Sequence, residues 1–564
     1  MTPQPPSSPI SAVAEASQRR PWRALAWLLA MIGGVSGFVW WLWQPPFDSE
    51  SGSGRLTQPF PLQSVADSSA KLDTALAALW QTEKVEPLPR ADDLAIARRL
   101  SLALTGSIPS MEQIRAFESR PDSLRVAWWI DQLLSDKRSA DYLAERFARA
   151  FVGTENGPFL VYRRLALTRW LSDQFEHDRP YDEVVRDLIS AEGLWTTNPA
   201  ANFITATIDN NNKKEGPDQI RLAIRTTRAF LGVRIDCVQC HDDKFGDRWK
   251  QQDFHQLAAY YAGAQMKFTG VRDNRNLPHE VRFRGDDTER TVLPAVPFSP
   301  ELLPDGGRPR ERLAAWVTSP ENLPFARATV NRVWAILFGR PIVEPIDDIP
   351  LEPAEVPEIL ETLAKDFVAH DFDLQRLISV IALSRAYQLD SHSPDPDSPA
   401  TASQEQHWAA FPLTRLRPEQ IAGSVIQAAS LDSIDGASPF ILQFAKFAQT
   451  NEFVKRYGDL GETEFEDRGG TIPQRLLMMN GKLVQERIGQ SPFINATTRI
   501  MTLAPDSAAA VDAAYLCVFT RRPTVTERDH FAAQLSEAKG RNRHRVIEDL
   551  FWTLMNSSEF AWNH

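Results

Sequence analysis

The sequence predicts a mainly α-helical protein with a single N-terminal transmembrane helix and two predominantly helical extracytoplasmic domains. Three observations predict this class: a long uncharged stretch near the N-terminus, apolar residues at helical spacing over most of the chain, and few strand signals. The 564 residues suffice for about three to four domains. Three cysteines are too few for a disulfide framework. The net charge of −11 argues against the basic surface that a nucleic-acid-binding protein needs. We therefore expect no nucleic-acid partner.

The predicted membrane anchor is residues 24–43 (ALAWLLAMIGGVSGFVWWLW), which carry no charge. Twenty helical residues span about 30 Å, the thickness of the hydrocarbon core of a bilayer. Arginines at positions 19, 20 and 23 precede the helix, so the positive-inside tendency places a tail of residues 1–23 in the cytoplasm. The bulk of the chain then lies on the periplasmic, extracytoplasmic side of the cytoplasmic membrane.

Two further readings concern this N-terminal segment. A cleaved signal peptide is the alternative to an anchor, but Gln44-Pro45-Pro46 follows and no small-x-small cleavage site is found. Gly33 and Gly37 form a G-x-x-x-G spacing, which would allow a homodimer of the helix. Residues 44–88 are rich in Ser, Gly and Pro, and we expect them to form a flexible stem.

Helical patterns dominate the folded part, which we expect to start with a domain over residues 89–263. A stripe of apolar residues from Leu94 to Leu104 ends at Gly106, and Ser110 with Gln113 predicts a capping box for the next helix. A further helix is predicted from Pro217 to Gly232, since proline favours helix starts and glycine favours helix ends.

The most specific motif follows that helix and reads Cys237-Val238-Gln239-Cys240-His241. Two thiols three positions apart can each add to one vinyl group of a haem, and the histidine directly after them can bind the iron from one face. Haem attachment also takes place outside the cytoplasm, where the anchor places this segment. The motif therefore predicts a covalent haem c at Cys237 and Cys240, with His241 as the proximal iron ligand.

Two alternatives for the motif remain open. A disulfide between Cys237 and Cys240 would form in an oxidising compartment. A metal other than haem iron is the second alternative, although a zinc site would need four ligands and no second C-x-x-C is present. The distal haem ligand is also open, with His255 or Met266 as the candidates in the aromatic-rich stretch after the motif.

The rest of the chain is expected to be a linker with at most one hairpin over residues 264–300 and a second helical domain over residues 301–564. The hairpin is predicted within residues 280–293, and an internal Pro- and Ser-rich linker over residues 392–404. Thr524 and Glu527 predict another capping box. The neighbouring carboxylates Asp347 and Asp348 can bind a cation, but solvated or capping carboxylates are the more common case.

Several stretches resemble the cytochrome-like planctomycete domain and the planctomycete surface domain that follows it, both of unknown function. In the first half these stretches are RRLSLALTGSIPS, RPYDEVVRDLIS and RAFLGVRIDCVQCHDDKF; in the second half they include FARATVNRVWAILFGRPIVEPIDD and LLMMNGKLVQERI. The resemblance implies haem-attaching thiols at Cys237 and Cys240 and a proximal ligand at His241. Members of the family often have histidines where Asp243 and Ile336 stand here.

These features together predict a membrane-anchored extracytoplasmic c-type haem protein that transfers electrons, with a redox or surface protein as its partner. The alternative is a non-catalytic surface or scaffold protein that keeps the fold and has lost the haem. No hydrolase elbow, zinc-protease helix or phosphate-binding loop is found in the sequence, so no enzyme activity is predicted.

Overall fold

The computed structural model describes most of the chain from residue 62 to residue 564. The described ranges are 62–154, 162–208, 216–243, 248–274, 277–283, 287–393, 395, 400–434, 438, 449–450, 452–457, 465, 472–481, 484 and 495–564. The predicted tail, the predicted anchor at residues 24–43 and the Gly33–Gly37 pair lie outside these ranges. In the ranges that are described, no helix combines the length and the apolar character needed to cross a bilayer.

The fold is mainly helical, as predicted. The first half contains α2 (Leu62–Glu83), α3 (Asp93–Thr105), α4 (Met111–Glu118), α5 (Asp122–Leu134), α6 (Lys137–Val152), α7 (Arg164–Glu176), α8 (Tyr181–Ser190), α9 (Asn202–Thr205), α10 (Gln219–Thr226) and α11 (Gln251–Ala258). Short helical turns η2 (Pro199–Ala201), η3 (Thr227–Leu231), η4 (Asp236–Gln239) and η5 (Ala259–Tyr261) connect them.

The second half continues with helices of similar length. These are α12 (Pro309–Val317), α13 (Leu323–Phe338), α14 (Glu358–Ala369), α15 (Leu374–Leu383), α16 (Arg385–Gln388), α17 (Ala402–Gln406), α18 (Pro418–Ala428), α20 (Ile472–Asn480), α22 (Ala496–Leu503), α23 (Ser507–Phe519), α24 (Val525–Glu537) and α25 (Arg541–Met555). The turns here are η6 (Pro300–Leu302), η7 (Pro353–Glu355) and η9 (Glu559–Ala561).

Local sequence signals locate several helix ends correctly. Gly106 ends α3 in the left-handed conformation with a φ of 66°, which glycine adopts without steric cost. Both predicted capping boxes are present, Ser110 with Gln113 at α4 and Thr524 with Glu527 at α24. These motifs were predictable because a cap needs only residues within one turn of each other.

The predicted stem over residues 44–88 is wrong for the part that forms α2. Leu72, Leu76 and Trp80 recur at helical spacing and are buried against α14 and α15. The indole of Trp80 also donates a hydrogen bond of 2.9 Å to the carbonyl of His407. The polar residues between these positions give the segment the composition of a linker. The apolar residues, however, recur every four positions and form one buried face of a helix.

Three small hairpins complete the structure. The predicted hairpin is confirmed as β3 (His279–Val281) paired antiparallel with β4 (Arg290–Val292). The expectation of at most one hairpin between the helical parts is wrong, because β1 (Ala264–Lys267) pairs with β2 (Gly270–Asp273) just before it. Strands of four residues are too short for a reliable alternation pattern. The third pair joins β5 (Thr414–Arg415) to β6 (Trp562–Asn563).

The predicted linker over residues 392–404 is also wrong at its end, since α17 begins at Ala402. Thr401 and Gln404 form a capping box there, in which the Thr401 hydroxyl accepts the amide of Gln404. A short polar helix carries no apolar stripe, so its sequence resembles a linker.

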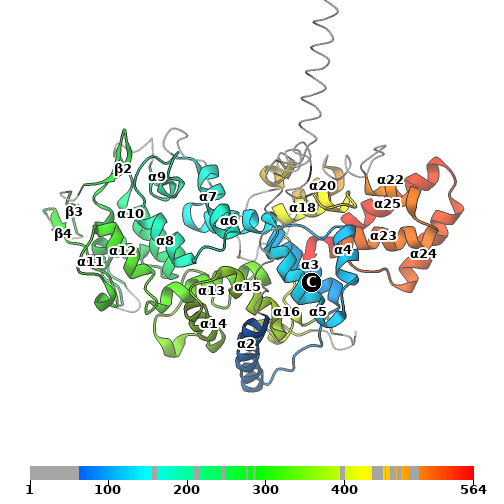
Figure 1. Ribbon diagram of the computed structural model, residues 1–564, viewed down its shortest axis with the longest axis horizontal. Coiled ribbons are helices and arrows are strands. Elements are labelled where there is room, and N and C mark those ends of the chain that lie inside the picture. Colours follow the sequence, from blue (N-terminus) through cyan, green and yellow to red (C-terminus); the bar gives the residue numbers. More distant parts are fainter. Residues whose placement is uncertain are drawn as a thin grey trace, which may run out of the picture.

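The two helical halves share one core. Helix α12 packs against α8, α13 against η3 and α3, and α15 against α5. Figure 1 shows α7–α12 at one end of the elongated molecule and α22–α25 at the other, with α3, α13 and α15 between them. Early helices therefore pack with late ones, and the order of elements in the sequence does not separate the halves in space.

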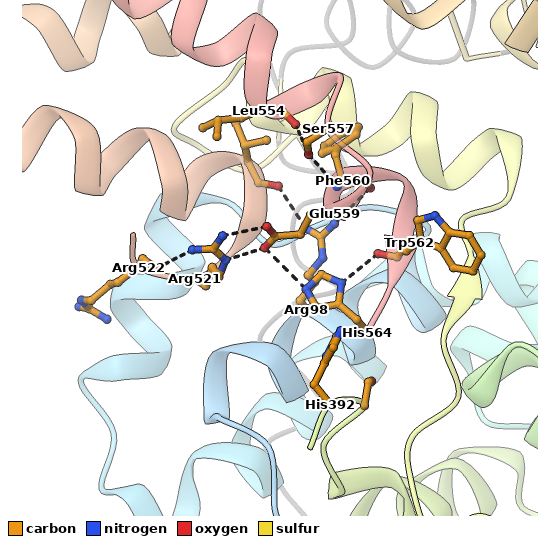
Figure 2. Close-up of polar contacts among 12 residues, drawn as sticks. Arg98, His392, Arg521, Arg522, Leu554, Ser557, Glu559, Phe560, Trp562 and His564 are labelled. Carbon is orange, nitrogen blue, oxygen red and sulfur yellow. Dashed lines mark hydrogen bonds and ion pairs between the residues drawn. The ribbon is translucent and has the colours of Figure 1, made fainter. Parts of the chain in front are cut away.

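The C-terminal segment returns to the middle of the molecule beside α3 (Figure 1). Arg98 of α3 donates hydrogen bonds to the carbonyls of Val518 and Phe560, at 3.1 and 3.4 Å. Figure 2 shows Arg98 beside Glu559 and His564, where Arg521 also pairs with the Glu559 carboxylate. Buried polar contacts thus fix the last residues to one of the first helices.

Candidate functional site

The Cys-x-x-Cys-His segment follows the predicted helix that ends at Gly232. Asp218 caps the start of α10 by accepting the amides of Ile220 and Arg221 at 2.9 and 3.2 Å. After α10 the chain forms one wide π turn, η3, and Gly232 ends it with a φ of 63°. The segment then enters the short 3₁₀ helix η4, which carries the first cysteine.

The two cysteines are exposed free thiols, whereas Val238 between them is buried. Cys237 lies in η4, and Cys240 is the residue that ends this helix, three positions later. Val238 and Ile235 are buried, so their side chains pack into the core. Both thiols are therefore exposed on a segment that buried apolar side chains attach to the core.

His241 has its ring orientation set by a backbone contact. Its Nδ1 lies 2.8 Å from the carbonyl oxygen of Asp242. Because a carbonyl only accepts, Nδ1 carries the proton and Nε2 keeps a lone pair in the neutral ring. A hydrogen bond from the other ring nitrogen to a carbonyl is typical of histidines that ligate metals.

Helix α11 fastens the C-terminal side of the motif. The carbonyl of Gln239 accepts hydrogen bonds from the Gln251 side-chain amide at 3.0 Å and from His255 Nε2 at 3.2 Å. The Asp242 carboxylate accepts the backbone amide of Gln251 at 2.7 Å, and thus satisfies a free amide at the start of α11. Three contacts therefore tie residues 239–242 to one helix.

His255 belongs to a buried chain of hydrogen bonds. Its Nδ1 lies 3.2 Å from His279 Nε2, and His279 Nδ1 lies 2.9 Å from the side-chain amide nitrogen of Gln219. Since the Gln239 carbonyl must accept from His255 Nε2, His255 Nδ1 is the acceptor and His279 Nε2 the donor. Burial lowers the pKa of His255, and its hydrogen bond to Gln239 opposes that shift only in part.

The two predicted distal ligands therefore stand differently. His255 is brought to the motif, but both of its ring nitrogens are engaged in hydrogen bonds. Met266 lies on β1, half-buried and opposite Val271 of β2. Ligation of iron by His255 would cost one of its two hydrogen bonds, either to Gln239 or to His279, whereas none of the hydrogen bonds of His255 is lost when Met266 is the ligand.

No group of three His, Cys, Asp or Glu side chains arranged to hold a metal ion is found within the described ranges. Cys237, Cys240 and His241 are adjacent in sequence without converging on one point. The donor set fits a haem better than a bare ion, because a haem takes up the two thiols at its rim and needs a single imidazole from the motif.

Two residues beside the motif were missed or misjudged in the sequence. His279 gave no signal, because it reaches His255 only through the β3–β4 hairpin. Asp347 was expected to be a solvated or capping carboxylate, and that expectation is wrong: it is 7% exposed and pairs with Arg228 and Arg234. Its neighbour Asp348 is exposed, as expected.

Comparison with known families finds one match in each half of this chain. Residues 71–266 match PSCyt2, a protein family of unknown function (DUF1549), and residues 309–458 match PSD1, also of unknown function (DUF1553). The chain therefore belongs to the proteins in which a PSCyt2 domain precedes a PSD1 domain, which confirms the resemblance and its order. The first match begins within α2. A search of the curated proteins and one of the solved structures found no match.

Proposed function

We propose that this protein is a c-type haem protein that is anchored in the cytoplasmic membrane by residues 24–43 and transfers electrons on the extracytoplasmic side. The observation that carries the proposal is the geometry of one segment. Two exposed free thiols lie three positions apart, one in η4 and one at its C-terminal end, and the next residue presents an imidazole with its lone pair on Nε2.

Each residue has a distinct part in this proposal. Cys237 and Cys240 would form the thioether bonds to the haem, and His241 would ligate its iron through Nε2. The haem supplies a one-electron couple when it is bound. The Asp242 carbonyl keeps the proton of His241 on Nδ1, and the partly buried contacts of the Gln239 carbonyl with Gln251 and His255 attach the segment that carries the cysteines to α11. His255 or Met266 would be the second protein ligand of the iron.

The test is to produce the full chain in a host equipped for cytochrome maturation and to measure the mass of the peptide that contains residues 237–241. We expect the mass of one haem on that peptide, and an absorbance spectrum of haem c in the membrane fraction. Cys237→Ser with Cys240→Ser should abolish both signals. Cys517→Ser is the matched control and should keep them, because the Cys517 thiol is buried in α23.

Unmodified thiols in the wild-type protein would contradict the proposal. A protein without haem would instead fit the alternative of a surface or scaffold module. Extraction of the membrane fraction with alkaline carbonate tests the anchor separately, since a transmembrane helix keeps the chain in the pellet.

The sixth ligand can be identified by substituting the two candidates one at a time. Met266→Ala or His255→Ala should convert a low-spin haem spectrum to a high-spin one, depending on which side chain binds the iron. An unchanged spectrum in both variants would exclude both residues as the ligand.

A further inference from the structure

We propose that Asp347, in the PSD1 domain, is a positioning residue for the Cys-x-x-Cys-His segment of the PSCyt2 domain. Its carboxylate holds the two arginines that flank the entry to this segment. The effect of Asp347 on a bound haem rests on the function proposed above. The positioning of the segment does not, because it can be measured on haem-free protein.

The first step is that the loop carrying Asp347 is fixed by one buried side chain. Asn331 of α13 is fully buried. Its side-chain oxygen Oδ1 accepts hydrogen bonds from the backbone amides of Ile342 and Val343 at 2.8 and 3.0 Å. Its amide nitrogen donates to the carbonyls of Val343 and Ile346 at 3.0 and 3.3 Å. A single amide thus satisfies four backbone groups of the loop and places Asp347 at its end.

The second step is that Asp347 binds both arginines with separate oxygens. Oδ2 lies 2.5 Å from Nε of Arg228, and Oδ1 lies 2.7 Å from Nε and 2.6 Å from Nη2 of Arg234. Burial alone would raise the pKa of the Asp347 carboxyl. The hydrogen bonds from both arginines and their charges outweigh burial and lower that pKa, so the carboxylate is ionised at neutral pH.

The third step is a backbone contact at the same place. Gly232 lies between the two arginines in sequence, and its carbonyl accepts the amide of Ile349 at 2.8 Å. A Cβ at position 232 would lie 2.8 Å from Cδ1 of Ile349 and 3.2 Å from Cβ of Ala328. The loop from the PSD1 domain therefore packs directly on the turn that leads to Cys237.

These contacts mean that the haem-binding segment is held at its two ends by different domains. The PSD1 loop holds residues 228–234 through Asp347 and Ile349. Helix α11 of the PSCyt2 domain holds residues 239–242 through Gln251 and His255. Cys237 lies between these two attachments, so the relative placement of the thiols and His241 depends on both.

The experiment compares Asp347→Asn with Asp348→Asn in the full chain. The two variants remove the same charge from neighbouring positions, but only the first removes the carboxylate that binds Arg228 and Arg234. Hydrogen–deuterium exchange is measured on haem-free protein for peptides covering residues 228–241 and residues 251–258. We expect at least tenfold faster exchange in residues 228–241 of Asp347→Asn, with residues 251–258 and the Asp348→Asn protein unchanged.

The haem-loaded proteins give a second readout. Asp347→Asn should have a higher reduction potential than Asp348→Asn, because positive charge near the haem that is not balanced by a carboxylate favours the reduced iron. Asp347→Glu should recover most of the wild-type potential, since it restores a carboxylate for the arginines.

The outcomes separate this proposal from the proposed function. Equal exchange in Asp347→Asn and wild type would overturn the positioning role, with or without haem. Absence of haem from every protein would overturn the proposed function, and the exchange data would still decide the positioning role. If Asp347→Asn does not fold, Arg234→Gln replaces it, because that side chain is 37% exposed; unchanged exchange there would also overturn the proposal.

Discussion

Arg228 and Arg234 beside the cysteine motif, and Arg98 and Arg99 in α3, both join segments that are far apart in the sequence. The first pair is about one-third exposed and shares the carboxylate of Asp347. The second pair is fully buried, and its acceptors are backbone carbonyls and one hydroxyl. Burial lowers the pKa of both Arg98 and Arg99 to about 10.

The two pairs differ in how much of the fold depends on them. The pair near the motif holds one segment, whereas the pair in α3 holds several buried segments together. Arg99 alone donates to the carbonyls of Tyr387, Leu389 and His564 and to the hydroxyl of Ser391. Three of these four contacts are buried, the one to His564 is partly buried, and all four acceptors would lose their donor together. The arginines near the motif remain in contact with water, so a change there affects the segment and leaves the rest of the fold intact.

The largest expected effect is therefore that of Arg99→Met. We expect a loss of about 3–5 kcal/mol in the free energy of unfolding, because several buried acceptors lose their donor at once. Denaturant unfolding followed by circular dichroism measures this loss. Arg221→Met, on the exposed side of α10, is the control and should change stability by less than about 0.5 kcal/mol. A loss below about 1 kcal/mol for Arg99→Met would contradict the assigned role.

Gly232→Ala should have the next largest effect. A Cβ at this position combines a positive φ with a clash against Ile349, and we expect a loss of about 2–4 kcal/mol in unfolding free energy. Gly540→Ala is the control for backbone strain without a clash, since its φ is 56° with a ψ of −129° and no atom lies within 4 Å of the added Cβ. It should cost about 1 kcal/mol. Equal losses in the two variants would show that the PSD1 loop does not pack on Gly232.

The contribution of Asp347 should depend on pH in a defined direction. Its pKa in the folded protein is lower than the ordinary aspartate value of about 3.9. The stability that its ionised form supplies is thus fully present above that value and is lost as the pH falls through the folded pKa. The difference in unfolding free energy between wild type and Asp347→Asn, about 1–2 kcal/mol at neutral pH, should be constant from pH 6 to 8 and shrink below about pH 4.

A difference that stays constant down to pH 2 would contradict this explanation, because the carboxyl would then act in its protonated form as well. Asp348→Asn should show no such trend, since Asp348 is exposed.

Arg234→Met should have the smallest effect on stability, about 0.5–1 kcal/mol, because the side chain is 37% exposed and Arg228 still pairs with Asp347. A double-mutant cycle with Asp347→Asn measures the interaction directly. A coupling energy above about 3 kcal/mol would mean that this pair contributes as much to the free energy of unfolding as Arg99 does. The contrast between the two regions would then disappear.

Local features of the fold could be predicted from the sequence, and features that depend on distant contacts could not. The end of α3 at Gly106, the capping box at Ser110 and the β3–β4 hairpin each depend on residues within a few positions. The stem was wrong because composition outweighed the spacing of Leu72, Leu76 and Trp80. The β1–β2 hairpin was missed because its strands are only four residues long.

The candidate site shows the same division. The motif itself was evident, because haem attachment needs a fixed spacing of two thiols and a histidine. The ring orientation of His241, the chain from Gln219 through His279 to His255, and the burial of Asp347 were not evident. Each depends on partners that the fold brings in from other segments.

The sequence by itself determined the helical class, the order of the two domains and the position of the Cys-x-x-Cys-His motif, because periodicity, capping and motif spacing are local properties. Only the tertiary structure decided what holds those residues in place: a carboxylate 110 positions beyond the first cysteine, and a histidine pair joined across a hairpin. The burial and pairing of a charged side chain depend on contacts made after the chain has folded, and such contacts leave no pattern in the sequence around it.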